Sequence, residues 1–398
     1  MGELSIYEEL LSLPGLKILR IEKISRQIDI YGEVDEGPQK CPVCMESTSL
    51  INQYTDRSIR DLDISGRQVW LHLKIKQYQC KSCTRFFSQK LSWADSSKSY
   101  TKRQAKWIFE MCEQQAFSQV GVLIDMHAKM VERVYYEYAK TRIDLKKRFA
   151  QVRNLGIDEL SHRKGKSSYC CVLTDLDRGI HLDILPNRKK ETLRAYFKQL
   201  GPDFCAQIEG VSCDMWSPYI ELAEECFPQA NLCIDRFHVV QSLNDSIDRL
   251  RRRLRKKNPD WEAIKGIKWV LFKQPQNLNS VQEQLLKKAF DECGSLSLMY
   301  QQRNEFHKIF DANSSYLSSL VQLNQWIEKV EKSQVGPYWN KFLNTLDNHK
   351  GYILNFVRTR LTNAATEGLN NLIRHIKRIS FGIPNFDNMR CRVLALNL

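Results

Sequence analysis

Two CxxC pairs place the strongest constraint on how the first part of this chain folds. Cys41 and Cys44 form one pair, and Cys80 and Cys83 form the other. Each spacing lets two thiolates face one tetrahedral Zn²⁺, and the residues between the pairs must then fold back on themselves. A module of this size has no large hydrophobic core, so a metal ion is a natural source of stability. The pattern predicts one structural zinc ion bound by all four cysteines, in preference to redox-active or coincidental cysteines.

Apolar and polar residues alternate around these pairs, which indicates β-strands. The alternation covers residues 16–34 in two runs that are broken at Ser25 and Arg26, as in a hairpin. It returns just before the second cysteine pair, at Val69, Leu71, Leu73 and Ile75. We therefore expect a small β-rich module.

From residue 101 the apolar residues follow a helical period, and three amphipathic helices are expected up to about residue 145. Helices at 118–124 and 127–139, with Gly121 at their contact, would form a helix-turn-helix. The second helix would present four side chains to the major groove of DNA, namely His127, Lys129, Glu132 and Arg133. An ordinary helical hairpin is the alternative.

After the charged linker at 144–148, strand patterns alternate with helical ones. Strands are expected at 154–158, 168–175, 180–185, 208–214 and 231–235, with a helix at 190–200. Three antiparallel strands followed by strands that alternate with helices is the order of an RNase H-like α/β fold. Only helical patterning follows, which predicts a helical insertion and then a strong amphipathic helix at 361–379.

The chain is thus predicted to be a multidomain α+β protein. The expected parts are a β-rich zinc-binding module at 1–90, a helix-turn-helix domain at 91–148, and an RNase H-like α/β core at 149–398. The helical insertion is expected at about 236–350.

Three acidic residues stand where an RNase H-like sheet would form a metal site. Asp158 ends the first strand, and Asp214 ends the fourth strand, which is its neighbour in such a fold. Glu367 lies in the late helix, and we expect Asn370, Asn371 and Arg374 on its side of that helix. The opposite side, facing the core, would hold Leu369, Leu372, Ile373 and Ile376.

Carboxylates at these positions suit phosphoryl-transfer chemistry on DNA. Two Mg²⁺ or Mn²⁺ ions ~4 Å apart need hard oxygen ligands while they bind the scissile phosphate, activate the attacking hydroxyl and stabilise the leaving oxygen. Asp235 ends the next strand and is the alternative to Asp214, which we prefer because Asp235 is expected at the edge of the site.

Further residues are candidates for accessory roles. Asp235, with Arg236 and His238, would orient the substrate or the strand end, although a core position for His238 is an equal alternative. Asn371 and Arg374 complete the accessory set. The basic run at 249–257 would present a phosphate track that includes Arg251, Arg252 and Arg255, or else a solvated helix face.

Several stretches of the sequence resemble the DDE transposases of bacterial insertion sequences. They are GIDE at 156–159, CDMWSPY at 213–219, DRFHVV at 235–240 and TEGLNNLIRHIKRISFGIPNF at 366–386. The cysteine pairs and the helix-turn-helix in front of them match the architecture of the ISL-three group, and the resemblance covers residues 38–395. It implies that Asp158, Asp214 and Glu367 are the three catalytic acids. It also implies that the enzyme cleaves DNA at terminal inverted repeats and transfers the 3′-OH into target DNA.

The charge of the chain fits such a partner. Lys and Arg outnumber Asp and Glu by 60 to 46, for a net charge of +14, which favours a polyanion such as double-stranded DNA. Pairing of two DNA ends makes a homo-oligomer the expectation.

We expect no membrane segment, because no stretch approaches ~18 consecutive apolar residues. The amino terminus also lacks a signal peptide, which predicts a cytoplasmic protein, nucleoid-associated when bound to DNA, with reduced thiols among its 13 cysteines.

Two other functions fit parts of the sequence. Residues 38–145 alone would suit a non-catalytic DNA-binding regulator, but this leaves the acidic residues unexplained. An RNase H-like nuclease without strand transfer would use the same acids.

Overall fold

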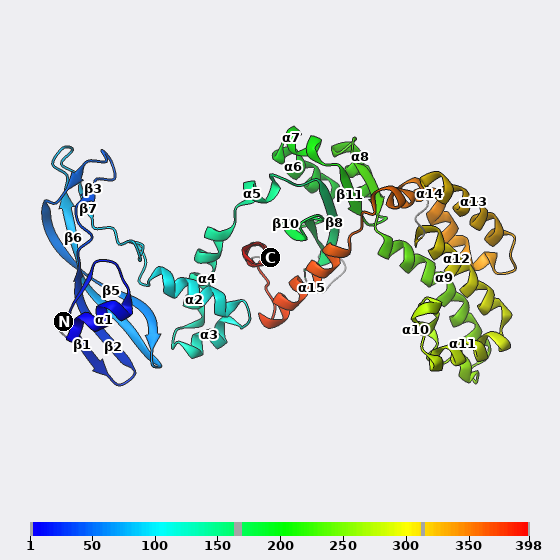
Figure 1. Cartoon of the computed structure of the whole chain (residues 1–398), viewed down its shortest axis with the longest axis horizontal. Coiled ribbons are helices and arrows are strands. Elements are labelled where there is room, and N and C mark those ends of the chain that lie inside the picture. Colours follow the sequence, from blue (N-terminus) through cyan, green and yellow to red (C-terminus); the bar gives the residue numbers. More distant parts are fainter. Residues whose placement is uncertain (1–2, 163–168, 312–314, 397–398) are drawn as a thin grey trace. The chain divides into compact units, whose positions relative to one another are not determined.

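The chain divides into two compact units (Figure 1). The computed structural model describes residues 3–162, 169–311 and 315–396. The first unit contains Met1–Ile143 and His375–Leu396, and the second contains Asp144–Arg374. No helix within the described residues is long and apolar enough to cross a membrane.

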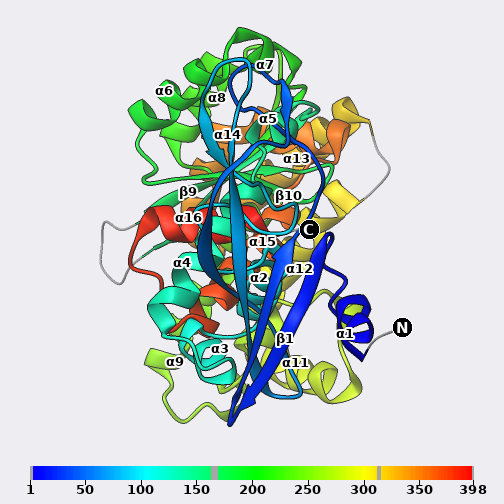
Figure 2. The same ribbon diagram turned by 90° about the vertical axis from the view of Figure 1, so that its left-hand side faces the viewer.

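The first unit begins with a five-stranded sheet that packs with helix α1 (Glu3–Leu11) beside β1 (Figure 2). The order is β1-β2-β6-β5, with β7 paired to β6. The strands are β1 (Leu16–Ile24), β2 (Gln27–Val34), β5 (Ile51–Ile64), β6 (Arg67–Gln79) and β7 (Phe86–Ser88). The predicted hairpin is confirmed by the antiparallel pairing of β1 with β2. The alternating residues of β6 are buried as predicted, so they form the core of this sheet.

The cysteine pairs lie at one end of this sheet. A two-stranded ribbon of β3 (Gln39–Lys40) and β4 (Ser47–Thr48) flanks the first pair, and β6 and β7 flank the second. The long β5–β6 hairpin spans the intervening residues, so its antiparallel pairing returns the chain to the first pair.

Four helices complete the first unit around a separate core. They are α2 (Lys102–Cys112), α3 (Phe117–Leu123), α4 (Ala128–Arg142) and the C-terminal α16 (Phe386–Ala395). The helix pair predicted at 118–124 and 127–139 therefore exists, with bounds shifted by one to three residues. Gly121 is needed where α3 meets the turn into α4, because a Cβ there would lie 2.5 Å from the Met126 carbonyl oxygen.

The second unit is built on a five-stranded mixed sheet with the order β10-β9-β8-β11-β12. Its strands are β8 (Asn154–Ser161), β9 (Tyr169–Asp175), β10 (Ile180–Leu185), β11 (Gly210–Cys213) and β12 (Asn231–Ile234). β8, β9 and β10 pair antiparallel, whereas β11 pairs parallel with both β8 and β12. All five predicted strands are present. Strand β8 continues three residues past Asp158, where we expected it to end, because Glu159, Leu160 and Ser161 pair with β9.

One short helix precedes this sheet, and four others follow its strands in the chain. They are α5 (Leu145–Phe149), α6 (Lys190–Leu200), α7 (Pro202–Gln207), α8 (Ser217–Cys226) and α15 (Ala364–Ile379). The last of these starts three residues later than predicted, and its chain turns at Gly382, which has a φ of +95°.

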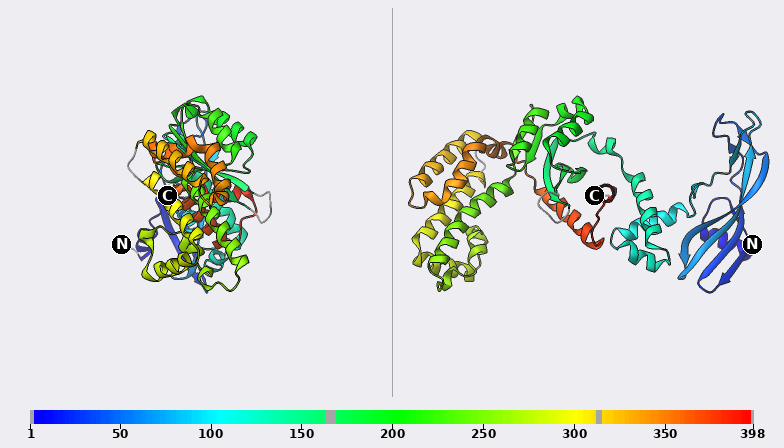
Figure 3. Two further views of the ribbon diagram at one scale, coloured as in Figure 1. Left: turned by 90° about the vertical axis from the view of Figure 1, so that its right-hand side faces the viewer. Right: turned by 180° about the vertical axis from the view of Figure 1, so that it is seen from behind.

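The predicted insertion is helical, and its helices pack against one another (Figure 3). They are α9 (Arg236–Lys257), η1 (Glu262–Ile264), α10 (Lys268–Leu271), η2 (Pro275–Asn277), α11 (Ser280–Glu292), α12 (Gly294–Asp311), α13 (Tyr316–Glu331) and α14 (Gly336–Thr359). Buried aromatic side chains hold them together, with Trp326 and Trp339 ring centres 5.7 Å apart.

Candidate functional site

The four cysteines converge on one point at the end of the first sheet. Their sulfur atoms all lie within 4.8 Å of one another, with 3.6 Å between Cys41 and Cys83 and 3.4 Å between Cys44 and Cys80. A zinc ion with Zn–S bonds of about 2.3 Å holds its sulfurs about 3.8 Å apart. Within the described ranges this is the one group of three or more His, Cys, Asp or Glu residues with such spacing. The donor set fits tetrahedral zinc.

The two CxxC turns have the same backbone. The residue after each second cysteine is left-handed, with φ of 64° at Met45 and 58° at Thr84. The amide of each first cysteine donates to a carbonyl five residues later, 2.8 Å from Cys41 and 2.9 Å from Cys80. In the first turn the backbone N–H groups of Cys44 and Val43 lower the pKa of Cys41 to about 6, which favours its thiolate. The pKa of Cys44 is raised instead, because its neighbouring thiols outweigh the Glu46 N–H that lowers it.

The residues beside the second turn differ from one another in environment. Phe87 stacks on Tyr78, with ring centres 5.8 Å apart. Phe86 is exposed and does not pack under the turn.

Three aspartates form one row at the edge of the second sheet. Ile157 lies opposite Cys213, and Cys213 lies opposite Ile234, in three parallel strands. The next residues of these strands are Asp158, Asp214 and Asp235, which we call the aspartate row. Because the register is the same in all three strands, the carboxylates leave the sheet on the same side.

Asp158 lies at the β8 end of this row, where two hydrogen bonds hold its carboxylate. Its Oδ1 accepts from the backbone N–H of Glu159 at 2.8 Å, and its Oδ2 accepts from Asn370 Nδ2 at 2.7 Å. Burial raises the pKa of Asp158 to about 6, and the negative charges of Asp235 and Asp214 act in the same direction. The Glu159 N–H and His238 oppose this increase. A bound cation would relieve such a concentration of negative charge.

His238 bridges the other two members of the row. Its Nδ1 lies 3.4 Å from Asp214 Oδ1, and its Nε2 lies 4.0 Å from Asp235 Oδ2. The side chain is 28% exposed, so His238 belongs to the site and not to the core. Asp235 is more buried than Asp214, and its Oδ1 accepts from the backbone N–H of Asn363 at 3.2 Å.

Glu367 is exposed in the first turn of α15, one helical turn before Asn370. The prediction that Leu369, Ile373 and Ile376 face the core is confirmed, since all three are buried. The prediction that Asn370 lies on the opposite side is wrong, because Asn370 is 2% exposed and its amide bonds to Asp158. The accessory candidates Asn371 and Arg374 are both exposed, and Arg374 donates to Asn371 at 2.6 Å.

One cationic residue beside the row was not anticipated. The Arg188 guanidinium lies between two aromatic rings, 4.7 Å from the centre of Tyr169 and 4.6 Å from that of Trp216. It also pairs with Glu159, the neighbour of Asp158. Arg188 therefore links β8 to the loop between β11 and α8 that carries Asp214. Its positive charge is the one signal of this role in the sequence.

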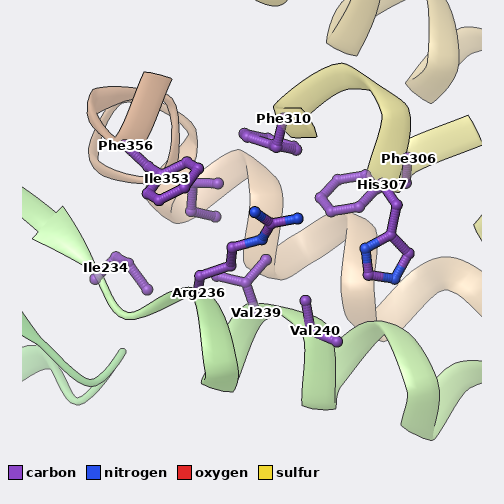
Figure 4. A pocket seen from close by; sticks show the side chains of 9 residues that line it. All are labelled: Ile234, Arg236, Val239, Val240, Phe306, His307, Phe310, Ile353 and Phe356. Atoms are coloured by element: carbon purple, nitrogen blue, oxygen red, sulfur yellow. The ribbon is translucent and has the colours of Figure 1, made fainter. Parts of the chain in front are cut away.

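The residue after Asp235 anchors the start of α9. Figure 4 shows the Arg236 side chain in a largely apolar pocket between α9, α12 and α14, with Phe310 and His307 nearby. Its guanidinium lies 5.2 Å from the Phe356 ring centre. This packing ties the aspartate row to the helical insertion.

The predicted DNA-contacting residues of the first unit lie on the surface. Lys129 and Arg133 are exposed on α4. His127 is exposed at the N-cap, where its Nδ1 accepts from the Lys129 amide at 3.3 Å. Glu132 is less exposed, and it accepts from Asn388 at 3.4 Å.

The basic run in α9 is only partly a surface feature. Arg252 and Arg255 are exposed as expected. Arg251 is buried, since its Nε donates to Asp248 at 2.6 Å, and so the helix does not present basic side chains on nearly all sides.

Comparison with known proteins was decisive for the second unit. Residues 155–393, more than half of the chain, match the ISL3 transposase family model with its DDE domain. The chain belongs to the ISL3 family of transposases. Residues 37–83 match the zinc finger of the transposases of IS204, IS1001, IS1096 and IS1165, and this range ends at the fourth cysteine of the cluster.

Two relatives of this ISL3 transposase are also transposases for insertion sequence elements. The transposase for insertion sequence element IS1001 of Bordetella parapertussis is 26% identical over 383 residues, which cover 93% of each chain. The transposase for IS1557 of Mycobacterium tuberculosis is 27% identical over 278 residues, covering 64% of this chain and 61% of that protein.

Family membership identifies the chemistry in outline. The chain is an enzyme that cleaves DNA and transfers strands, which favours this function over a regulator or a simple nuclease. The cysteine cluster is a zinc ribbon with a structural zinc, and the DDE domain uses a divalent metal.

Proposed function

We propose that the second unit is an RNase H-like catalytic core in which Asp158, Asp214 and Glu367 bind the divalent metal. The aspartate row carries this proposal. Asp158 and Asp214 lie side by side on adjacent parallel strands, and α15, which bears Glu367, is hydrogen-bonded to Asp158 through Asn370. The three antiparallel strands beside the row agree with the strand order of that fold.

The donor set suits two Mg²⁺ or Mn²⁺ ions. Carboxylate oxygens are the ligands that these ions prefer, and the raised pKa values of Asp158 and Asp235, caused mainly by burial, mark a site where a cation is favourable. When bound, the metal would polarise the scissile phosphate and lower the pKa of the attacking water or 3′-hydroxyl. The protein groups position it: Asn370 orients Asp158, and His238 orients Asp214.

Asp214 is the preferred second ligand, and Asp235 is a positioning residue. Asp235 is 6% exposed, and its Oδ1 accepts from the Asn363 N–H, which fixes the loop before α15. Asp214 is 27% exposed at its side chain and is open to an incoming ion.

The first unit would recognise the terminal inverted repeats. Helices α3 and α4 would form a helix-turn-helix, with His127, Lys129 and Arg133 entering the major groove, and the zinc ribbon would contact adjacent DNA. Arg252 and Arg255 would contact phosphates near the core. Two such chains would pair the ends of the element before the strand is transferred to target DNA.

The test is strand cleavage on DNA that carries both ends of the element. Zinc-loaded protein is incubated with and without Mg²⁺, and the strands are mapped on a denaturing gel. We expect Glu367→Gln and Asp158→Asn to abolish cleavage while end binding remains, because each removes a metal ligand and leaves the DNA-binding unit intact. Glu331→Gln, an exposed helical glutamate, is the matched control. Cleavage retained by Glu367→Gln would refute the assignment.

A further inference from the structure

Helix α15 contacts the second sheet through polar side chains. Asn363, just before the helix, donates from Nδ2 to the Ile157 carbonyl oxygen at 3.1 Å. Thr366 Oγ1 donates to Asn363 Oδ1 at 3.2 Å, and Asn370 Nδ2 donates to Asp158 Oδ2 at 2.7 Å. The three residues are 3%, 0% and 2% exposed, in that order, so this polar stripe is buried. A stripe of directional bonds fixes the register of the helix more tightly than apolar contacts would.

Glycine in β8 allows this close approach. A Cβ at Gly156 would lie 2.7 Å from both Asn363 Oδ1 and Thr366 Oγ1. Any larger residue would force these two buried side chains, which bond to each other, to shift. Asn370 is therefore held at a fixed distance from Asp158.

The side-chain amide of Asn370 has a hydrogen-bond partner at its nitrogen but, among the described residues, none at its oxygen. Its Nδ2 donates to Asp158, whereas no group among the described residues donates a hydrogen bond to its buried Oδ1. The reverse orientation of the amide would place its oxygen against a carboxylate oxygen, which is repulsive. Buried polar atoms are nearly always bonded, so Oδ1 requires a partner such as a water molecule or a cation.

We propose that Asn370 Oδ1 is a neutral oxygen ligand of the divalent cation that Asp158 binds. This inference rests on the proposed metal site and adds a residue to it. An amide oxygen is a hard ligand of the kind that Mg²⁺ and Mn²⁺ accept, and it supplies coordination without more negative charge. That property matters here because three aspartates already stand in one row. Asn370 would then bind the cation with one end of its amide and hold Asp158 with the other.

The test is Mn²⁺ affinity of the zinc-loaded full chain without DNA, measured by the electron paramagnetic resonance signal of free Mn²⁺. Asn370→Ala removes both ends of the amide and should raise the Kd for Mn²⁺ at least ~10-fold, the usual effect of losing a group that supports a metal. Asn370→Asp keeps an oxygen ligand but loses the donor, and should bind Mn²⁺ at least as tightly as the wild type. Asn344→Ala, at an exposed helical asparagine, should leave the Kd unchanged.

A second readout separates ligation from packing. Asn370→Asp faces Asp158 with a second carboxylate, so its Tm without Mn²⁺ should fall below that of the wild type. Mn²⁺ should then raise its Tm more than that of the wild type, which a purely structural role for Asn370 would not produce. Circular dichroism checks that each variant is folded.

Three results would overturn the inference in different ways. Wild-type Mn²⁺ affinity in Asn370→Ala would mean that only water occupies this position. Affinity in Asn370→Asp as weak as in Asn370→Ala would mean that donation to Asp158 is the whole role of Asn370. A Kd unaffected by Asp158→Asn would remove the proposed metal site itself, and this inference with it.

Discussion

The zinc ribbon and the aspartate row both bring together side chains that suit metal ions. The residues of the row and their partners are farther apart in the sequence than those of the ribbon. In the ribbon, two short turns of the same backbone geometry each supply two thiols, and one hairpin brings the turns together. In the second sheet, single aspartates come from three strands, and their partner Asn370 lies 212 residues from Asp158. Local sequence alone sets the geometry within each turn of the ribbon, whereas the whole fold is needed to form the row.

The two regions also differ in whether their ligand atoms already have the spacing of a metal site. All four cysteine sulfurs already have the spacing of a tetrahedral site. In the aspartate row, Asn370 donates a hydrogen bond to Asp158 and His238 lies 3.4 Å from Asp214, but no three acidic ligand atoms among the described residues have comparable spacing. A closed structural site and the open metal site that we propose for the row are expected to differ in this way.

The largest effect is expected within the aspartate row. Asp214→Asn should lower the rate of strand cleavage by more than ~1,000-fold, because it removes a metal ligand, whereas Asp235→Asn should lower it by about 10-fold. Single-turnover cleavage at saturating Mg²⁺ measures both. The reverse order would make Asp235 the ligand and Asp214 the positioning residue.

In the ribbon, Cys80→Ser should reduce bound zinc from one ion per chain to nearly none. The folding free energy of such a small module depends on its metal, so affinity for the DNA end should also fall by more than about 10-fold. Zinc content by atomic emission and a gel-shift titration measure these changes. Cys293→Ser, outside the cluster, should change neither, and zinc retained by Cys80→Ser would contradict the four-cysteine site.

A smaller effect is expected at Arg188. Arg188→Ala should reduce cleavage by about 10-fold, because it releases Glu159 and Trp216 and loosens the loop that carries Asp214. Arg188→Lys should restore little of the cleavage activity, since lysine lacks the planar guanidinium that stacks on the aromatic rings and pairs with Glu159. Arg194→Ala breaks an exposed ion pair with Glu225 and is the matched control. Equal losses in both alanine variants would show that Arg188 has no particular role.

The smallest effect concerns stability. Burial raises the pKa of Asp158 to about 6, above its value in an unfolded chain, so the ionised carboxylate favours unfolding at high pH. In Mg²⁺-free buffer at pH 8, Asp158→Asn should raise the free energy of unfolding by about 1–2 kcal/mol, less than the full shift implies because the side chain is partly exposed.

This gain should shrink as the pH falls through 6 towards 4, where the carboxyl group becomes protonated in both states. Urea unfolding at pH 8 and pH 5 measures it. A gain that is larger at pH 5 would contradict the assigned cause.

Much of the fold was predictable because its signals are local. The strand at 180–185 and the helix at 190–200 match the expected bounds residue for residue, since alternation and amphipathic period report burial directly. The cysteine spacing predicted the zinc site for the same reason. The aspartate row followed from strand ends and from the resemblance to DDE transposases.

Three features could not be predicted because they depend on contacts between distant segments. Asn370 was assigned to the exposed side of its helix, since a polar residue is expected there unless a buried partner is known. Arg188 is noticeable only once β9, β11 and α8 bring Tyr169 and Trp216 around it. Arg251 was expected on the surface, but Asp248 accompanies it into the interior.

The most direct test of the central claim is a crystal structure of the zinc-loaded protein soaked in Mn²⁺, with anomalous scattering recorded at the manganese edge. We expect manganese bound by carboxylate oxygens of Asp158, Asp214 and Glu367. Manganese bound by Asp158 and Asp235 without Asp214, or no manganese at the aspartate row, would contradict it.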